Sequence, residues 1–547
     1  MPNPTVIASG FAFFAKHDVP WPITVLFALL LTGLIVCLAM EEQIHAKKSL
    51  IAGVFAIICL LAGTATGVLT FDKIIVGSTE VIPTESEIQI EPLDHSEDLD
   101  GPITINRNAA DKEPADHTSQ TDDPQAKTVP EDDPSATDGG EEDHHLFLDG
   151  EQISMPVYIP GIDWGVIAII FGSSLFVDAA SKSGIFSWIA IKVTKASGGD
   201  PLRLLFFYGI MTVVFSAVLN NVTAMIIVGS LTVVSLEKLG RREMLLGFLL
   251  IEGLLTNIGG LLTLISSVPN IIVGTTAEIS FVEFFRKSAP YVLVATLVTL
   301  WMGAKAFNIG RLKTVEEKDE GRKLVSGFDE NDGVESKSFF WFSTIVLVLF
   351  ILTIAFASVI PFVSDLGMGF VALSYAAIML IRFKSEVNRF YSSIDWDLLG
   401  FFMALFAIIY VMEHAGVLAS IGTGLQMILQ DVTSATGNKL DAAILLLGSA
   451  AFSSVTDNIP LAAMLAKILQ QLGAEGTSSL WWSVIFGANL GGNITPIGSA
   501  STLVAVTIMH KHGLKLSFAG FVKAAFLFAI IQITIAILYV LFILPML

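Results

Sequence analysis

Cysteine and charge are both scarce in this chain. Only 2 of its 547 residues are cysteine, Cys37 and Cys59, and only 15% are Asp, Glu, Lys or Arg. Both cysteines lie inside apolar runs, so we expect them to pack between helices and not to form a disulfide. A soluble protein of this length needs far more charge on its surface, so the composition excludes a water-soluble globular fold.

Motifs of enzyme chemistry are absent as well. The sequence contains no HExxH, no GxSxG, no GxxxxGK[ST] and no paired aspartates in a protease-like setting. We therefore expect neither an enzyme nor a protein that binds nucleic acid. No cysteine lies near the polar segments described below, so a thiol relay for metalloids is not expected either.

Long apolar runs are abundant. Hydrophobic residues make up 53% of the chain, and runs of about 20 such residues can each cross a hydrocarbon core of about 30 Å. The sequence therefore predicts an all-α polytopic membrane protein. Simple spans are expected near 22–40, 48–70, 162–181, 289–308, 339–361, 367–382, 396–413 and 520–545. Polar and glycine-rich clusters interrupt three further apolar stretches, 204–236, 244–276 and 441–510.

The negative charge is confined to one segment. Between Glu80 and Glu151 there are 22 acidic and three basic residues, which accounts for nearly all of the net charge of −20. This segment is rich in Pro, Thr and Asp and poor in apolar residues, so it cannot bury a core. We predict that residues 72–161 form a disordered loop between two membrane helices.

Basic residues indicate the orientation in the membrane. They follow the first and third spans, flank both ends of 204–238 and fill the linker 309–338. The positive-inside rule makes these positions cytoplasmic, which predicts a re-entrant hairpin over 204–238 with its turn at 219–224. A second hairpin is expected at 441–472. Ten spans and two hairpins then place both termini and the acidic loop outside, in what we expect to be a bacterial inner membrane.

An internal repeat is the strongest structural signal. Three pairs recur at an offset of 232: Ile162-Asp163-Trp164 with Ile394-Asp395-Trp396, Gly184 with Gly416, and "NIGGLLTLISS" at 257–267 with "NLGGNITPIGS" at 489–499. A fourth pair, "FSAVLNNVTA" from Phe215 and "FSSVTDNIPL" from Phe452, recurs at an offset of 237.

The repeat predicts an inverted architecture. The first half comprises 1–71 and 162–308, and the second half is 339–547. Each half would hold five spans and one hairpin, and because five is odd the second half enters the membrane from the opposite side. In secondary transporters of this kind the site lies near the midplane at broken helices, which we expect at 244–276 and 480–508.

Polar residues gather at the predicted hairpin tips and helix breaks. In the first half they are Asn220, Asn221, Thr223, Asn257, Gly259, Gly260 and Thr263. In the second half they are Asp457, Asn458, Asn489, Gly491, Gly492, Asn493 and Thr495. Their carbonyl, amide and hydroxyl oxygens suit a small cation, whereas the half-helix N-termini suit an anion. Such residues also serve close helix packing, but two copies at repeat-related positions favour a binding site.

Two acidic residues stand out in the apolar segments. Asp457 lies at the second hairpin tip and Glu252 lies in an apolar helix, and an intramembrane acid is by default a functional residue. A carboxylate that binds either Na⁺ or H⁺ is sufficient for antiport. We predict a Na⁺ site formed by Asn221, Asn257, Asp457 and Asn489, and proton coupling by Asp457 with help from Glu252. Beyond these transported or coupling ions we expect no cofactor.

Four segments resemble signature sequences of the ion-transporter superfamily. They are "NNVTAMIIV", "TNIGGLLTLISSVPNIIVG", "TDNIPLAAML" and "ANLGGNITPIGSAS". That superfamily includes arsenite efflux permeases, D-type bacterial sodium/proton antiporters, the melanosomal P protein, and sodium-coupled dicarboxylate and citrate carriers. The resemblance covers the membrane part, 22–308 and 339–547. It implies a homodimer in which a scaffold domain holds a transport domain, built from both hairpins and both broken helices, that moves as an elevator.

The resemblance leaves the cargo open. The tips of its dicarboxylate carriers look like Ser-Asn-Thr, whereas this chain has Asn220-Asn221-Val222-Thr223 at one tip and Asp457-Asn458-Ile459-Pro460 at the other. The tip carboxylate favours Na⁺/H⁺ antiport. The alternatives are proton-coupled efflux of arsenite or another oxyanion, sodium-coupled carboxylate transport, and a passive channel, since broken helices also build ion filters.

Overall fold

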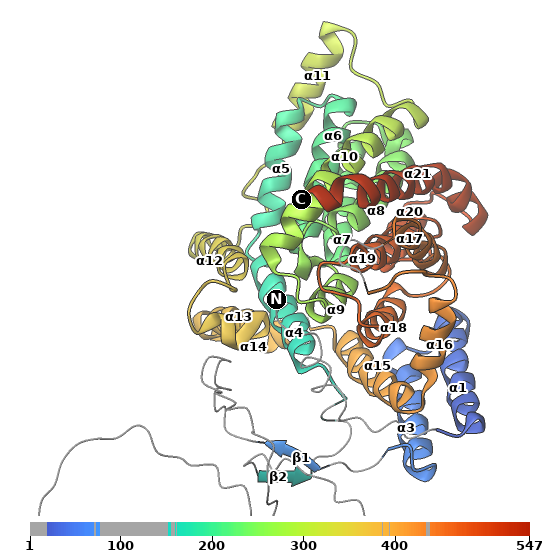
Figure 1. Ribbon diagram of the computed structural model, residues 1–547. Helices are drawn as coiled ribbons and strands as arrows, with labels where there is room; N and C mark the ends of the chain where they lie inside the picture. The colour runs from blue at the N-terminus through green and yellow to red at the C-terminus, as the bar shows by residue number, and fades with distance from the viewer. Residues whose placement is uncertain are drawn as a thin grey trace, which may run out of the picture. The chain divides into compact units, whose positions relative to one another are not determined.

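The computed structural model describes residues 19–69, 73–76, 151–154, 159, 161–384, 387–392, 394–433 and 438–547. The chain forms two compact units, residues 1–71 with 156–547 and residues 72–155. In the second unit β1 (Lys73–Val76) pairs antiparallel with β2 (Glu151–Ser154), and Lys73 lies opposite Ser154 (Figure 1).

These two strands correct the prediction that 72–161 is disordered throughout. Ile74, Ile75 and Val76 are β-branched, and such side chains fit the pleated backbone of a strand. The acidic composition concealed this short apolar run at the start of the segment. The rest of the predicted acidic loop lies outside the described residues.

The described residues of the first unit are helical, and ten of their helices are long and apolar enough to cross a membrane. These are α1 (Trp21–Ala39), α3 (Lys48–Ala65), α4 (Trp164–Ser181), α6 (Pro201–Val218), α7 (Asn221–Lys238), α10 (Phe281–Ala306), α12 (Lys337–Ala355), α13 (Val363–Arg382), α15 (Trp396–His414) and α21 (Phe518–Leu538), which continues in short turns to Met546. The prediction of an all-α polytopic membrane protein is confirmed for this unit.

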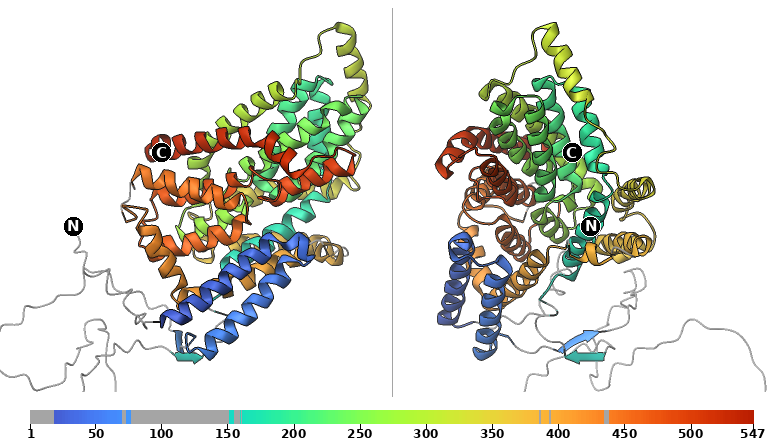
Figure 2. Two further views of the ribbon diagram at one scale, coloured as in Figure 1. Left: turned by 90° about the vertical axis from the view of Figure 1, so that its right-hand side faces the viewer. Right: turned by 180° about the vertical axis from the view of Figure 1, so that it is seen from behind.

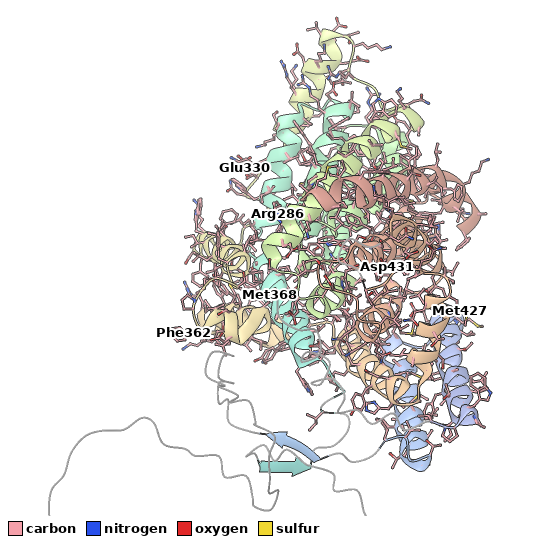
Figure 3. All side chains as sticks on the ribbon, in the orientation of Figure 1. Arg286, Glu330, Phe362, Met368, Met427 and Asp431 are labelled. Atoms are coloured by element: carbon pink, nitrogen blue, oxygen red, sulfur yellow. The ribbon has the colours of Figure 1, made fainter. Side chains whose placement is uncertain are left out.

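The outward faces of these helices are apolar. Leu61 on α3 is 67% exposed and Ile381 on α13 is 75% exposed. Figure 3 shows Phe362 and Met427 projecting from the periphery, and both are more than three-quarters exposed. Large apolar side chains in such numbers are unfavourable in water and fit a lipid surround.

Shorter helices join or interrupt the spans. They are α2 (Glu41–Ile44), α5 (Ile185–Ser197), α8 (Leu245–Gly259), α9 (Val268–Thr276), α11 (Val315–Ser326), α14 (Val387–Tyr391), α16 (Val417–Gln426), α17 (Lys439–Ser453), α18 (Asn458–Gln471), α19 (Ser479–Gly491) and α20 (Ala500–Lys511). Helices α17 and α18 form the second predicted hairpin. The first is formed by α6 and α7, each 18 residues long, so their lengths alone do not require a re-entrant path.

Both predicted helix breaks are present. Helix α8 ends at Gly259 and α9 begins at Val268, while α19 ends at Gly491 and α20 begins at Ala500. Glycine tolerates the turn and proline removes a backbone donor, and each break contains both, with Pro269 at the start of α9 and Pro496 before α20.

The two halves pack in a reciprocal pattern. Helix α3 lies against α15, and α4 lies against α13. The hairpin helices instead pack on the broken ones, α6 and α7 on α8, and α17 and α18 on α19. Figure 2 shows α1 and α3 side by side in blue, apart from the green and red helices that include α8 and α20. The first unit therefore has a peripheral set of spans and a central set of interrupted helices.

The predicted linker 309–338 contains helix α11. Thr314 and Glu317 form a capping box at its start, and the backbone N–H groups of Thr314 and Lys313 hold the pKa of the Glu317 carboxyl below its usual range. Helix α11 packs on α5, and Lys195 of α5 donates a hydrogen bond to Glu330. The linker is thereby fixed to the first half of the repeat.

The two cysteines are free. Cys59 is buried and Cys37 is partly buried. The prediction that they pack and form no disulfide is confirmed.

We predict that Gly487→Ala destabilises the protein. A Cβ at Gly487 of α19 would lie 2.6 Å from the carbonyl oxygen of Leu446 and 2.6 Å from the Cβ of Ser449, and forced shifts of this kind cost about 1–3 kcal/mol. Thermal unfolding of the purified protein in detergent measures the loss.

The matched control is Gly448→Ala on the facing helix α17. A Cβ there meets nothing within 4 Å, so the substitution is expected to leave the midpoint unchanged or raise it slightly. Equal stability of the two variants would contradict the close helix contact at Gly487.

Candidate functional site

Each hairpin tip is formed by the N-cap of its second helix. Asn220 caps α7, and its side chain accepts a hydrogen bond from the backbone N–H of Thr223 at 2.8 Å. Asp457 caps α18 and accepts from the backbone N–H of Ile459 at 3.1 Å. Asn and Asp are preferred at this position because their oxygen satisfies an unpaired helical donor. The tips therefore form for local reasons, and the two capping residues occupy equivalent places in the two hairpins.

Hydroxyl groups bind each hairpin to its own broken helix in the same way. Ser216 Oγ donates to the Thr256 carbonyl at 2.7 Å, and Ser453 Oγ donates to the Ala488 carbonyl at 2.6 Å. Thr263 and Thr495 complete the pattern by donating to the carbonyls of Ala217 and Ser454, both at 2.5 Å. These contacts recur at the offsets of 237 and 232 that relate the sequences of the two halves.

Asn257 is the centre of a buried network that joins the two halves. Its Nδ2 donates to Asn493 Oδ1 at 2.8 Å. Its Oδ1 accepts from Ser499 Oγ at 2.8 Å, from Ser501 Oγ at 3.1 Å and, more weakly, from Asn221 Nδ2 at 3.4 Å. Three of the predicted site residues, Asn221, Asn257 and Asn493, are thus brought together.

Asn489 belongs to the same network through a different route. Its Nδ2 donates to Asn270 Oδ1 at 2.9 Å, and its Oδ1 accepts from Ser267 Oγ at 2.8 Å. Asn270 in turn donates to the Gly260 carbonyl at 2.6 Å. At the far end Asn493 Nδ2 donates to Gln532 Oε1 of α21 at 2.8 Å.

Sequence reasoning missed several members of this network. Ser267 and Ser499 occupy the last position of the matched repeat segments, so the repeat could have identified them. Asn270 follows Pro269 in "SSVPNIIVG", where a polar residue in an apolar run was a signal. Gln532 lies in an apolar span, and nothing in the sequence relates it to Asn493.

Glycines at the breaks permit close approach. A Cβ at Gly260 would lie 2.7 Å from Asn221 Oδ1, and one at Gly259 would lie 2.7 Å from the Val213 carbonyl oxygen. At the second break a Cβ at Gly492 would lie 2.9 Å from the Gly498 carbonyl oxygen, and Gly491 faces the backbone of Ala450 just as closely. The predicted glycines therefore allow the hairpin tip and the broken helix to meet.

Three of the predicted tip residues lie apart from the network. Asn220 is exposed, Thr223 contributes its backbone N–H to the Asn220 cap, and Asn458 is the first residue of α18. They shape the tips, and within the described residues their side chains form no hydrogen bond to the amides around Asn257.

Asp457 has a partner that the sequence did not reveal. Its Oδ2 lies 2.5 Å from Nζ of Lys48, the first residue of α3, and its side chain is 14% exposed. Of the four residues predicted to bind Na⁺ together, Asn221, Asn257 and Asn489 share one network, whereas Asp457 is held by Lys48. Nothing in the sequence relates two residues 409 positions apart.

Glu252 is fully buried in α8. Its Oε1 accepts from Thr232 Oγ1 of α7 at 2.6 Å, and its Oε2 has no hydrogen-bond partner in the part of the chain that the structure describes. No basic side chain of those residues forms an ion pair with it. An ionised carboxylate is very costly in such surroundings, so this group is suited to hold a proton.

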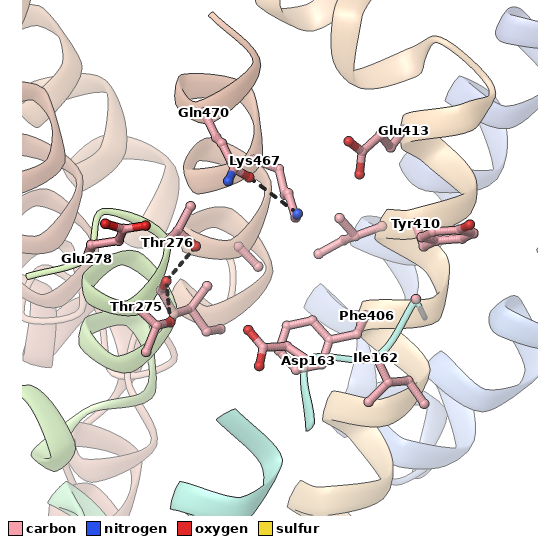
Figure 4. Close-up of a pocket in the computed structure, with 14 residues that line it drawn as sticks. Ile162, Asp163, Thr275, Thr276, Glu278, Phe406, Tyr410, Glu413, Lys467 and Gln470 are labelled. Carbon is pink, nitrogen blue, oxygen red and sulfur yellow. Dashed lines mark hydrogen bonds between the residues drawn. The ribbon is translucent and has the colours of Figure 1, made fainter. Parts of the chain in front are cut away.

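A separate cavity of about 370 Å³ lies between α4, α9, α15 and α18 (Figure 4). Asp163, Glu278, Glu413 and Lys467 are its charged lining residues. In Figure 4 the side chains of Asp163, Glu413 and Lys467 extend toward the same space. Three carboxylates against one ammonium favour cations over anions in this cavity, and none of the predicted site residues lines it.

Comparison with known proteins gives consistent matches to transporters. The family model described as citrate transporter (CitMHS) matches residues 145–487. A 46 kDa membrane protein of Mycobacterium leprae is 30% identical over 395 residues, covering 69% of this chain and 86% of that protein. An uncharacterized transporter of Mycobacterium tuberculosis is 28% identical over 387 residues, with the same coverage.

Two more distant proteins are also similar. The human P protein is 25% identical over 474 residues, covering 72% of this chain and 55% of that protein. The solved structure of Neisseria gonorrhoeae MtrF, of a class of antimetabolite efflux pumps, superposes with a TM-score of 0.49 at 15% identity, covering 70% of this chain and 82% of that one.

We predict that Asn257→Ala lowers the free energy of unfolding by at least about 2 kcal/mol, because each buried polar partner left unpaired costs about 1–3 kcal/mol. Chemical or thermal unfolding in detergent measures the change. The control is Asn388→Ala on the exposed face of α14, where a shift within about 0.5 kcal/mol is expected. Equal effects at the two positions would show that the Asn257 network does not hold the halves together.

Proposed function

The chain belongs to the citrate transporter family and is a secondary transporter, and on that premise we propose that it exchanges Na⁺ for H⁺. Asp457 and the network around Asn257 are the proposed ion-binding groups. Na⁺ and H⁺ are the proposed cargo and coupling ions.

The observation that carries this proposal is the meeting of polar side chains from the first hairpin and both broken helices. The network around Asn257 and Asn489 consists of amides and hydroxyls, and it contains no basic side chain. Amide, hydroxyl and carbonyl oxygens are the ligands that hard cations such as Na⁺ prefer. In this proposal the carboxylate at the tip of the second hairpin, Asp457, supplies the negative charge that makes binding of a cation favourable.

The paired contacts support an inverted repeat. Ser216 with Thr256 and Ser453 with Ala488 form equivalent bonds in the two halves. Helices α3 and α15, and α13 and α4, likewise pack reciprocally. Gly184 and Gly416 hold the same left-handed conformation, with φ of 84° and 71°, at the starts of α5 and α16.

We propose an elevator movement on this architecture. The hairpins and broken helices pack mainly on one another and form the moving transport domain. Helices α3, α4, α13 and α15 belong to the scaffold, and α5 and α16 are the arms that connect the two parts. The proposed assembly is a homodimer in a bacterial inner membrane.

Glu252 is the second proton site in this proposal. It lies on α8, the helix that also carries Asn257, and it is held by one hydroxyl with one oxygen left over. A neutral acid buried within the ion-binding helix can release its proton only when a positive charge arrives near it. Binding of a cation on the same helix brings such a charge, so in this proposal Glu252 releases its proton when the cation binds.

A second candidate is cation-coupled transport of a carboxylate such as citrate. The family description favours it, and so do the N-termini of α9 and α20, whose N-cap residues Ser267 and Ser499 belong to the network. Helix N-termini present free N–H groups and favour anions. The negative charge of Asp457 disfavours an anion near the tip of the second hairpin, and for this reason we place cation exchange first.

We predict that Na⁺ or Li⁺ dissipates an inward-acid pH gradient in proteoliposomes that contain the purified protein and a pH-sensitive dye. K⁺, citrate, a dicarboxylate and arsenite are added in separate samples. Asp457→Asn is expected to abolish the Na⁺ response, because the amide keeps the helix cap but cannot exchange a proton for a cation.

Asp365→Asn on the exposed start of α13 is the matched control and should exchange like the wild type. A dye response to citrate or arsenite alone would replace cation exchange with the second candidate or with oxyanion efflux. A response to every ion without coupling would indicate a channel.

We predict that Glu252→Gln folds normally, since its amide oxygen can still accept from Thr232, but reduces Na⁺-driven proton movement by at least about tenfold. Proton flux and Na⁺ flux are measured in the same vesicles. A loss of proton flux with Na⁺ binding retained supports Glu252 as a proton site. Wild-type proton flux in this variant would exclude it from the mechanism.

A further inference from the structure

We propose that Lys48 is an internal competitor of the transported cation. Its ammonium occupies the cation position on Asp457 when no ion is bound, and Na⁺ or H⁺ must displace it. This inference rests on the proposed Na⁺/H⁺ exchange and adds to it a residue from outside the two hairpins and the broken helices.

The position of Lys48 is defined by a direct contact. Its Nζ lies 2.5 Å from Asp457 Oδ2, so the two side chains form a direct ion pair with a charge-assisted hydrogen bond. The other oxygen of Asp457, Oδ1, accepts the backbone N–H of Ile459 and so holds the start of α18. Oδ2 is the Asp457 oxygen that does not take part in the helix cap, and Lys48 occupies it.

The pair adds a charged contact between two groups of helices that meet only lightly, directly at α15 and α18 and through α16. Helix α3, which Lys48 begins, packs on α1 and α15, whereas α18, which Asp457 caps, packs mainly on α9, α19 and α16. The Lys48–Asp457 pair therefore ties the tip of the second hairpin to the peripheral spans.

Other acidic groups surround the ammonium. Glu41 Oε1 of α2 lies 3.8 Å from Lys48 Nζ, and Asp397 of α15 accepts a hydrogen bond from Ser49 and acts electrostatically on Lys48. With Asp457, three carboxylates from three elements face one ammonium. When a cation takes Asp457, Glu41 offers Lys48 an alternative partner, so the ammonium can leave without losing its charge compensation.

The exchange at Asp457 balances in charge and atoms. Na⁺ binds the Asp457 carboxylate as the Lys48 ammonium departs intact, and no covalent bond is broken. A proton that binds Asp457 has the same effect, because a neutral carboxyl no longer attracts the ammonium. With Na⁺ or H⁺ on Asp457, the second hairpin is released from α3. With neither ion bound, the hairpin stays paired to Lys48 of α3.

An exchanger requires that the loaded carrier can move and that the empty carrier cannot. If the empty carrier could change sides, one ion would move without the other and the gradients would run down. A tie that exists only in the empty form prevents that leak, because the hairpin tip is held by Lys48 until an ion arrives.

The test is Lys48→Met. Without the competing ammonium, the half-saturating Na⁺ concentration for binding to the purified protein is expected to fall about tenfold, the loss of roughly one charge-assisted hydrogen bond. In proteoliposomes the variant is expected to let Na⁺ cross without an equivalent movement of protons. Binding is measured with radioactive Na⁺, and coupling is measured from the two fluxes.

Two further variants serve as controls. Lys47→Met removes the same charge from the adjacent, exposed residue and should bind and couple like the wild type. Lys48→Arg keeps a cation at the position and should not lower the half-saturating Na⁺ concentration. If Arg and Met lower it equally, side-chain shape and not charge is responsible, and the inference is wrong.

Failure of the inference is distinguishable from failure of the proposed function. Normal exchange in the wild type, together with unchanged or weaker Na⁺ binding in Lys48→Met, overturns only the role of Lys48. A wild-type protein that neither binds nor exchanges Na⁺ overturns both.

Discussion

The hydrogen bond between the buried amides of Asn257 and Asn493 is the contact on which the rest of the site depends. Each amide lies at or beside a helix break, where backbone groups would otherwise lie unpaired in an apolar environment. Such groups cost several kcal/mol each in hydrocarbon, so irregular backbone persists only where side chains complete it. Asn493 does this across the two halves by donating to the Leu254 carbonyl at 3.2 Å, and Asn270 donates to the Gly260 carbonyl at the first break. In the proposed function the same polar surface binds the ion. Under the proposed function, structural need and ion binding use the same atoms, so packing and function are not competing explanations for these residues.

The parts of the site that the sequence predicts are those with local causes. Glycine and proline define the breaks. Asn220 and Asp457 cap α7 and α18, the second helices of the two hairpins. The repeat adds a second copy of each signal, and that is why Ser216 and Ser453 could be aligned before any contact was known. The structure at these positions is determined by residues only a few positions away in the sequence.

The parts that the sequence does not predict depend on distance in space. Lys48 begins a span that, in the sequence, could have faced the solvent at the membrane surface. Gln532 is one polar residue in an apolar helix, with no local signal for its partner. The lengths of α6 and α7 leave a re-entrant path undecided, and β1 was concealed by the acidic composition that follows it. In each case a local pattern is compatible with more than one tertiary arrangement, and packing selects among them.

The placement of charge distinguishes this site from a simple polar pore. The amide network is neutral, and the two carboxylates proposed to take part in transport differ in kind: Asp457 is ion-paired and 14% exposed, whereas Glu252 is fully buried and bonded to Thr232. A neutral lining lowers the barrier for an ion to enter and leave, and a paired carboxylate makes entry conditional on displacing its partner. Because the partner, Lys48, belongs to a helix outside the two hairpins and the broken helices, the proposal connects ion binding to the freedom of the hairpin to move. On this proposal, a site with the same oxygens but without the Lys48 pair would bind ions more tightly, yet it would lack any means of holding the empty carrier in place.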